Sequence, residues 1–407
     1  MTQRYARITG WGKYVPAHRL TNYDLEQTID TNDEWITSHT GIRERRIAAP
    51  GETAVDMALQ ASRAALERAK IQPEDLNLIV FATSTPDYLV PAAASLLQDR
   101  LGARGVAAFD LNAGCTGSVY ALVTGSQFIR TGMYERVLVV GAEKLSVGID
   151  YTDRNTAIMF GDGAGALVLE ASNSPTGLLS FELGSDGAQW DALYCPGGGS
   201  ANPFSEKVLN EREHYLRMDG KRVYKFVAKT ITRSIQNVVE SSGLPFSEID
   251  YLIPHQSNIR IVEMIASRLK FDLSKVMVNL DRYGNTSSAA IPMAIADAAD
   301  QGKITEGDHI VLTGFGAGMT WGSAVLHWEP TKPAEEQEAI LVENWPIREA
   351  LQLQANKMRA AVWSAQVTAR TKAQEASMSV MLPFYTWQRK RKKAKEQQEG
   401  DASGDQS

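Results

Sequence analysis

Three side chains in the sequence are of types that can act together in covalent catalysis: the thiol of Cys115, the imidazole of His255 and the amide of Asn285. Cys115 lies in LNAGCTGSVYAL, between a short apolar run and a predicted helix. The positive end of a helix lowers the pKa of a thiol, and its free N–H groups point at incoming negative charge. This position favours a nucleophilic thiolate. For a cysteine taken alone, the alternative is an inert apolar side chain packed beneath the helix.

The other two side chains are expected in loops that follow strands or precede helices. IPHQSN places His255 just past a predicted strand, and RYGNTSSAAIP places Asn285 in a glycine turn before a helix. In layered α/β folds, sites form in the loops beyond the carboxyl ends of strands. Taken singly, His255 could be a structural histidine and Asn285 a helix cap. The coincidence of all three at such positions favours a catalytic set.

Alternating apolar runs and amphipathic stretches predict the elements that must position these side chains. Buried strands are expected at 76–83, 136–142 and 165–170, a strand entering a polar turn within 249–258, and a strand running into a glycine turn within 308–318. Helices are expected at 53–69, 116–132, 222–243 and 257–270. The segment LNLIVFATSTPD matches IDYLIPHQSN, and RVLVVGAEK matches HIVLTGFGAG, in the same order. Two copies of one α/β unit, 1–175 and 176–330, are therefore expected to pack as a duplicated five-layer αβαβα fold.

Composition narrows the class of protein. With 43% hydrophobic and 22% charged residues, 32 Gly and 2 Cys, the chain is neither a disordered nor a disulfide-stapled protein. The net charge of −6 argues against broad nucleic-acid binding. Because no export signal and no apolar run of membrane-spanning length is evident, a cytoplasmic protein with Cys115 and Cys195 as free thiols is expected.

The strings NAGCTG, PHQSNIRI and RYGNTSSAAIP resemble the active-site motifs of the β-ketoacyl-acyl carrier protein synthase III family. The segments 30–48, 150–170 and 315–326 also look like that family, so the resemblance covers about residues 4–328. It implies the thiolase fold, which agrees with the duplication. It also implies an acyltransferase that initiates fatty acid synthesis by decarboxylative Claisen condensation, with no cofactor and no metal, because the CoA thioesters are substrates.

The resemblance assigns a role to each motif. Cys115 would be acylated by an acyl-CoA, and malonyl-acyl carrier protein would then be decarboxylated. His255 and Asn285 would hold the resulting enolate oxygen. The Cys115 N–H and a donor from the Gly316–Gly318 turn would hold the tetrahedral intermediate.

The resemblance also implies binding residues. Trp35 and Arg154 would sandwich the CoA adenine, Asn258 would lie near the pantetheine arm, and Lys225 and Arg260 would dock the acidic carrier protein. The alternatives are a core tryptophan, a salt-bridging surface arginine and a solvated helix face for the two basic positions.

Two positions depart from the family pattern. His39 stands where the family commonly has an arginine contacting the CoA phosphates, so CoA affinity or selectivity is expected to differ. Val90 stands where some members carry a phenylalanine that reaches into the partner's acyl pocket in a homodimer. Its smaller side chain predicts a longer cavity. The string GDGAGA at 161–166 lacks phosphate-loop spacing and is interpreted as a tight turn without nucleotide.

The segment 331–407 is not covered by the resemblance. It begins like a linker, then shows a weak apolar stripe that predicts a helix over 347–376, and ends with MLPFYTW followed by RKRKKAK. An aromatic cluster beside a basic run suggests weak contact with a membrane surface or with the carrier protein. The alternative is a solvated, mostly disordered end.

Other functions on the same fold stay open. A starter-unit or acyl-transfer enzyme of specialised, polyketide-type metabolism is the nearest alternative, although the presence of both His255 and Asn285 favours condensation. A biosynthetic thiolase is disfavoured because FGAGMTWG contains no second cysteine. A scaffold protein would not need all three side chains.

Overall fold

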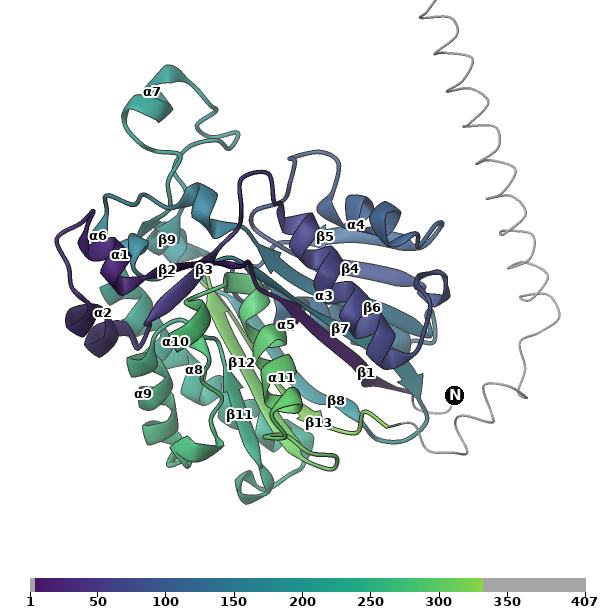
Figure 1. The fold of residues 1–407 in the computed structure, drawn as a ribbon. Coiled ribbons are helices and arrows are strands. Elements are labelled where there is room, and N and C mark those ends of the chain that lie inside the picture. Colours follow the sequence, from purple (N-terminus) through teal and green to yellow (C-terminus); the bar gives the residue numbers. More distant parts are fainter. Residues whose placement is uncertain (1–3, 332–407) are drawn as a thin grey trace, which may run out of the picture. The chain divides into compact units, whose positions relative to one another are not determined.

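The computed structural model describes residues 4–331 (Figure 1). Its main sheet contains β1 (Tyr5–Tyr14), β4 (Leu78–Ala82), β5 (Ala107–Leu111), β6 (Arg136–Glu143), β7 (Gly163–Ser172), β8 (Gly177–Ser185), β11 (Tyr251–Pro254), β12 (His309–Gly316) and β13 (Thr320–His327). Two small ladders join β2 (His18–Thr21) to β3 (Glu44–Ile47), and β9 (Leu193–Tyr194) to β10 (Arg217–Met218). The helices are α1 (Asn22–Glu26), α2 (Asp33–Thr40), α3 (Ala54–Ala69), α4 (Ala93–Leu101), α5 (Gly117–Arg130), α6 (Arg154–Ala157), α7 (Glu206–Asn210), α8 (Gly220–Ser242), α9 (Ile259–Leu269), α10 (Leu280–Tyr283) and α11 (Ala290–Asp300).

The strand order repeats. The main sheet reads β11-β12-β13-β8-β1-β7-β6-β4-β5. A parallel bridge between Leu252 and Val276 adds one more position beside β11. If the strand positions of each half are numbered in chain order, both halves read 3-2-4-5-1 from the outer edge of the sheet inward. The halves meet where β1 lies parallel to β8. The predicted duplication of one α/β unit is confirmed, whereas the predicted division at residue 175 stays a prediction.

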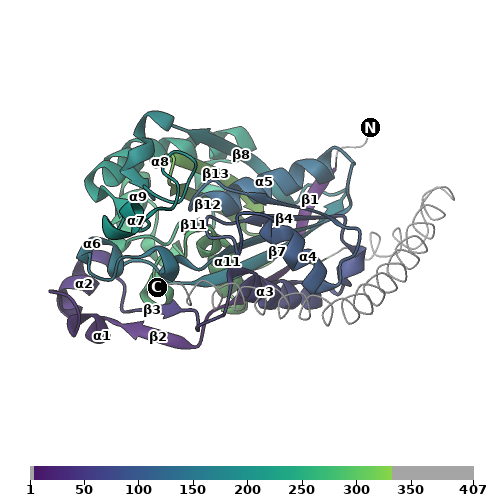
Figure 2. The same cartoon turned by 90° about the horizontal axis from the view of Figure 1, so that it is seen from above.

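The layers follow from the alternation of side chains along the strands. In β4, Ile79 and Phe81 belong to one buried cluster with α3 and α4, whereas Leu78 and Val80 belong to another with α5 and α11. The second half has the same arrangement, because β12 and β13 pack against α8 on one face and against the central helices on the other. Helices α5 and α11 therefore lie between the two halves of the sheet (Figure 2). This is the predicted five-layer, thiolase-like fold.

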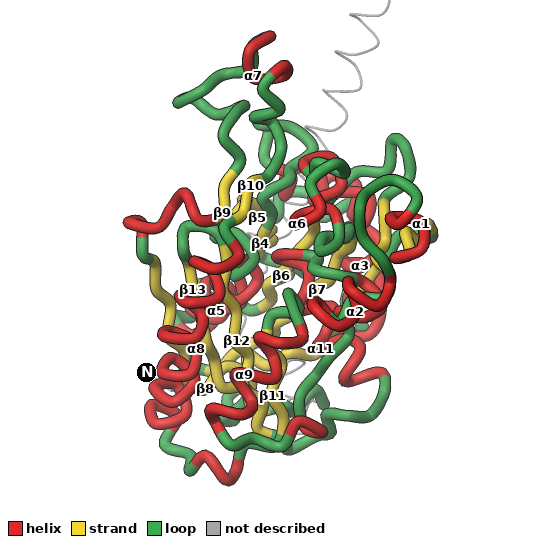
Figure 3. The backbone as a smooth tube through the Cα atoms, turned by 90° about the vertical axis from the view of Figure 1, so that its left-hand side faces the viewer, coloured by secondary structure: helices red, strands yellow, loops and turns green. Residues whose placement is uncertain are grey.

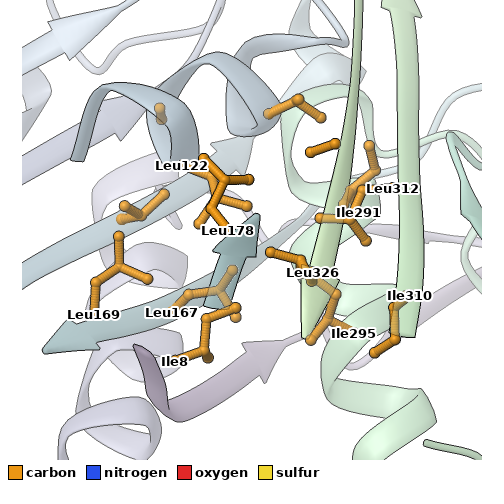
Figure 4. Close-up of a cluster of buried hydrophobic side chains, with 14 of the residues drawn as sticks. Ile8, Leu122, Leu167, Leu169, Leu178, Ile291, Ile295, Ile310, Leu312 and Leu326 are labelled. Carbon is orange, nitrogen blue, oxygen red and sulfur yellow. The ribbon is translucent and has the colours of Figure 1, made fainter. Parts of the chain in front are cut away.

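The central cluster holds the halves together (Figure 4). Leu122 of α5 and Ile291 and Ile295 of α11 meet side chains from β7 of the first half and from β12 and β13 of the second. Because aliphatic side chains are buried on both sides of α5 and α11, packing fixes where these two helices begin. The N-terminal ends of α5 and α11 carry the loops of Cys115 and Asn285.

The predicted helices and strands of residues 53–318 are confirmed within a few residues at each end. The loop that carries α7 extends away from the layers (Figure 3). No helix within residues 4–331 is long and apolar enough to cross a membrane. The domain boundary expected near residue 330 lies at the end of the described residues. The helix expected at 347–376 lies outside them.

Candidate active site

Cys115 lies between β5 and α5, one residue before the N-cap Thr116, and its side chain is buried. The end of β12 comes so close that a Cβ atom on Gly316 would lie 2.4 Å from the backbone nitrogen of Cys115. Only glycine permits this approach, because a real Cβ needs more than 3 Å. The predicted strand-to-helix position of the thiol is confirmed.

The direction of the thiol pKa differs from the sequence prediction. Burial, together with the negative charge of Glu143, raises the pKa of Cys115 to about 11, and the Ser287 side chain partly opposes this rise. The helix N-terminus predicted a lowered value, but desolvation of a thiolate in a fully buried site outweighs it. The thiol of the free protein is therefore protonated at neutral pH.

His255 follows β11 and is 1% exposed. Its backbone N–H donates to the carbonyl of Thr313 at 2.8 Å, and its ring packs edge-on against Phe315 with centroids 5.2 Å apart. Burial lowers the pKa of the imidazole to about 3, so the ring is neutral and carries one N–H donor. Within the described part of the chain, Nδ1 has no hydrogen-bond partner.

Asn285 is held by three hydrogen bonds. Its backbone N–H donates to the carbonyl of Met159, and its own carbonyl accepts from Gly161. The side-chain Oδ1 accepts from the backbone N–H of Ser287. The side chain thus closes a short local turn and is not the N-cap of a helix, the alternative considered from the sequence, and the Nδ2 donor is left for another partner.

One cavity of about 910 Å³ brings the three residues together. Cys115, His255, Asn285 and Gly316 line it, and so do four other residues singled out in the sequence, Trp35, His39, Asn258 and Arg260. Much of the remaining wall is apolar, with Ile158, Met159, Phe160, Leu193, Val223, Phe315 and Met319. A nucleophile and two uncharged donors in a largely apolar cavity suit acyl transfer through an oxyanion.

The expected adenine site has its two groups in direct contact. The Arg154 guanidinium lies over the Trp35 ring, 4.6 Å from its centroid, and the His39 ring stacks on Trp35 at 4.3 Å. Arg154 itself does not line the cavity, although the next residue, Asn155, does. An adenine placed between Trp35 and Arg154 would have to separate them.

Asn258 and Arg260 connect two helices at the cavity wall. Asn258 caps α9 by accepting from the backbone N–H of Arg260, and its Nδ2 donates to the carbonyl of His39. The guanidinium of Arg260 donates to the carbonyl of Ser38. These bonds tie α9 to α2, the helix of Trp35.

Three further predicted residues lie outside the cavity. Lys225 is exposed on α8, where Lys221 and Tyr224 line the cavity instead. Val90 is 84% exposed in the loop between β4 and α4. Gly318 lies in the turn between β12 and β13 with a φ of +135°.

Glu143 was not singled out from the sequence. It is the last residue of β6, fully buried, and its side chain is bonded to the loop that follows Asn285. The rule that drew attention to His255, a polar residue at the carboxyl end of a buried strand, applies equally to Glu143. It was missed because RVLVVGAE resembles an ordinary strand that ends in a surface glutamate.

Both cysteines are free, as predicted. Cys195 is exposed, and its sulfur lies 3.3 Å from the carbonyl of His214. Over residues 4–331, no group of three or more His, Cys, Asp or Glu side chains is placed to hold a metal ion.

Known proteins match the chain over both halves of this site. A family profile described as 3-oxoacyl-[acyl-carrier-protein] synthase III matches residues 109–187, which include Cys115, and the C-terminal profile of the same family matches 239–328, which include His255 and Asn285. The curated β-ketoacyl-[acyl-carrier-protein] synthase III of Desulfitobacterium hafniense is 48% identical over 321 residues, 79% of this chain and 97% of the relative. The chain belongs to the β-ketoacyl-acyl carrier protein synthase III family.

Solved structures of the synthase III family have the same fold. The 3-oxoacyl-[acyl-carrier-protein] synthase III of Aquifex aeolicus is 41% identical, with a TM-score of 0.74 over 79% of this chain and all of that one. A priming β-ketosynthase from a polyketide biosynthetic pathway is 33% identical, with a TM-score of 0.75 over 80% of this chain and 97% of that one. The family, the fold class and the enzyme class predicted from the sequence are confirmed.

Proposed function

We propose that this synthase III condenses an acyl-CoA starter with malonyl-acyl carrier protein, and so initiates fatty acid synthesis. The observation that carries the proposal is the cavity in which a buried thiol, a neutral imidazole and an oriented amide meet. Each of the three has a separate task in a two-step reaction through an acyl-enzyme.

In the first step Cys115 attacks the thioester carbon of the acyl-CoA, and CoA leaves as a thiol. The oxyanion of the tetrahedral intermediate needs two donors that are already in place. The backbone N–H of Cys115 and one from the Gly316–Gly318 turn are the proposed donors. The close approach of Gly316 to Cys115 supports this assignment.

In the second step malonyl-acyl carrier protein loses CO₂, and the enolate attacks the acyl group on Cys115. His255 and Asn285 donate to the enolate oxygen through an imidazole N–H and through Nδ2. Because burial holds the pKa of His255 near 3, the donor is a neutral imidazole. A neutral donor stabilises the enolate without protonating it.

The binding roles follow from the same cavity. Trp35 and Arg154 are proposed to take the adenine of CoA between them, and Asn258 to lie beside the pantetheine arm. Lys225 and Arg260 are proposed to dock the acidic carrier protein, since both are exposed cations near the cavity wall. No bound cofactor is required.

The assembly and location are also proposals. The exposed apolar loop of Tyr88, Leu89 and Val90 supports a homodimer in which this loop meets the partner. A cytoplasmic location rests on the composition of the chain and on its two free thiols.

A starter-unit enzyme of polyketide-type metabolism is the second candidate. The 33% identity to a priming β-ketosynthase favours it, because that likeness also extends over 80% of the chain. The two candidates differ in the acyl group and in the acceptor, and both pass through acyl-Cys115.

Intact mass spectrometry after mixing the protein with acyl-CoAs of two to ten carbons tests the proposal. An acyl mass on Cys115 that is discharged by malonyl-acyl carrier protein supports initiation of fatty acid synthesis. Discharge only by another acceptor supports the second candidate. Acylation that survives in Cys115→Ala would contradict both.

A further inference from the structure

Glu143 is a buried acid that accepts several hydrogen bonds. Its two carboxylate oxygens accept from the backbone N–H of Ser84 and from the hydroxyls of Thr83, Thr85, Ser287 and Ser288. Within residues 4–331, it makes no salt bridge. The mechanism above gives this buried charge no task.

The charged groups around Glu143 are directed elsewhere. The ammonium of the next residue, Lys144, donates to the carbonyls of Ala49 and Glu52. In β7, which pairs with β6, Glu170 binds Arg136 at the opposite end of the ladder. In α11, Asp297 binds Lys13.

The titratable group of the site on which Glu143 acts electrostatically is the thiol of Cys115.

Ser287 connects the acid to the nucleophile. Its hydroxyl donates to Oε1 of Glu143 at 3.2 Å, and its side chain is close enough to Cys115 to lower the pKa of the thiol. The backbone of Ser287 has a φ of +50°, a left-handed conformation that is uncommon for residues other than glycine. The adjacent Ser288 hydroxyl reaches the same carboxylate oxygen at 2.8 Å, but its other contact is the carbonyl of Ala82.

We propose that Glu143 takes up the proton of the Cys115 thiol through the Ser287 hydroxyl when the acyl donor is attacked. The S–H bond breaks as the Ser287 oxygen gains that proton, and the O–H bond of Ser287 breaks as Oε1 of Glu143 gains the second. The products are a thiolate, an intact serine and a neutral carboxylic acid. No electrons are transferred, and no solvent proton is needed.

The electrostatics of the site favour this transfer over loss of the proton to solvent. Two anions in one buried site repel strongly, so the thiol and the carboxylate titrate as a coupled pair. Burial raises the pKa of Glu143 as well as that of Cys115, which makes the carboxylate a stronger base. Moving the proton from one to the other keeps the number of buried charges at one.

The hydroxyl proton of Ser287 can serve only one partner at a time. While Glu143 is ionised, this proton points to the carboxylate. Once Glu143 is protonated, its O–H donates to Ser287, and the Ser287 proton turns to the thiolate. The relay therefore stabilises the nucleophile in the same step that creates it.

The test measures the pH dependence of acyl-Cys115 formation and of Cys115 alkylation by iodoacetamide. It rests on the proposed role of Cys115 as nucleophile. Glu143→Gln and Ser287→Gly are expected to slow both reactions by about 10² at pH 7, and to recover as the pH rises toward 10. Glycine suits the positive φ at position 287, so this variant removes the hydroxyl without adding strain.

Ser288→Ala is the matched control, because it removes a hydrogen bond of the same carboxylate outside the relay. Its pH midpoint should equal that of the unaltered protein. Glu143→Gln reacting faster at pH 7 would mean that the acid only repels the thiolate. A lower melting temperature with an unchanged midpoint in both test variants would mean that the group is only structural. Either result overturns the relay, whereas an unaltered protein that is never acylated at Cys115 overturns the proposed function instead.

Discussion

The side-chain oxygen of Asn285 accepts a hydrogen bond from the backbone N–H of Ser287 at 2.8 Å. This bond distinguishes the two ends of the amide, because only the oxygen end can accept. Nδ2 is therefore presented as a donor before any substrate arrives. A donor that needs no reorientation is what an oxyanion site requires.

Asn285→Asp keeps the acceptor and replaces the donor by a second oxygen. We expect decarboxylation of malonyl-acyl carrier protein to fall by about 10²–10³, with acylation of Cys115 much less affected. His255→Ala should behave in the same way. Release of CO₂ and intact mass measure the two steps separately, and loss of acylation with retained decarboxylation would reverse the assigned roles.

Cys115→Ala should abolish acyl-enzyme formation while the fold is kept. The change removes one buried sulfur and leaves the backbone contact with Gly316 in place, so the loss of stability should be about 1–2 kcal/mol. Intact mass tests the first expectation, and the melting temperature tests the second.

The pKa of His255 predicts two pH dependences. Because the value in the folded protein is about 3, the imidazole stays neutral, and the decarboxylation rate should show no inflection near pH 6.5. In the unfolded chain the same group has its ordinary pKa of 6.5. Between pH 6.5 and 3 the unfolded state therefore binds more protons, and stability falls as the pH is lowered through this window.

Urea unfolding at pH 7, 6 and 5 measures that loss. His255→Ala removes the titrating group, so the variant should lose less stability than the unaltered protein between pH 7 and pH 5. Equal losses in the two proteins would contradict the buried, neutral imidazole.

Val90→Phe should shorten the longest acyl chain that Cys115 accepts, if the exposed loop completes the partner's pocket. The side chain is 84% exposed, so the fold should be unaffected. A chain-length series of acyl-CoAs read by mass provides the measurement, and sedimentation gives the oligomeric state. An unchanged profile in a dimer would remove Val90 from the pocket.

Removal of residues 334–407 should leave condensation nearly unchanged at saturating carrier protein. The truncated chain keeps Thr331 because the carbonyl of that residue accepts a hydrogen bond from buried Arg7. If Arg389–Lys393 contact anionic lipid, each contributes about 1 kcal/mol, and only the full chain sediments with anionic vesicles at low salt. If they contact the carrier protein, the truncation raises KM for its malonyl form. If the truncation alters neither vesicle binding nor KM, the result supports a solvated C-terminal end.

The sequence was sufficient for the features that repeat with a period. The apolar runs of β4 and β6, which recur between the amphipathic helices α3 and α8, predicted the layers, and the strand-end rule found His255. What it could not supply are contacts between segments far apart in the chain. Glu143 and Ser287 are 144 residues apart, and their contact depends on how α11 packs against β6.

The thiol shows a second limit of sequence reasoning. A helix start predicts a lowered thiol pKa, but the depth of burial decides whether the pKa rises or falls. The depth of burial cannot be derived from a local sequence pattern. The same limit applies to Lys225. Packing sets how α8 is rotated about its axis, and this rotation brings Lys221 and Tyr224, instead of Lys225, to the cavity wall.

The repeated strand order has a consequence for the origin of the site. Leu78 lies opposite Val137 in the first half, as Tyr251 lies opposite Ile310 in the second. Counting on from these pairs, Glu143 corresponds to Gly316. Counted back from the first residues of α5 and α11, Gly114 corresponds to Ser287, which shares its positive φ. Asn112 corresponds to Asn285, and Cys115 to Ser288. An ancestor with two identical halves would have had two equivalent helix starts facing one another. In the present chain they have diverged, so that one start carries the sulfur and the other carries the hydroxyls that bind the acid at the end of β6.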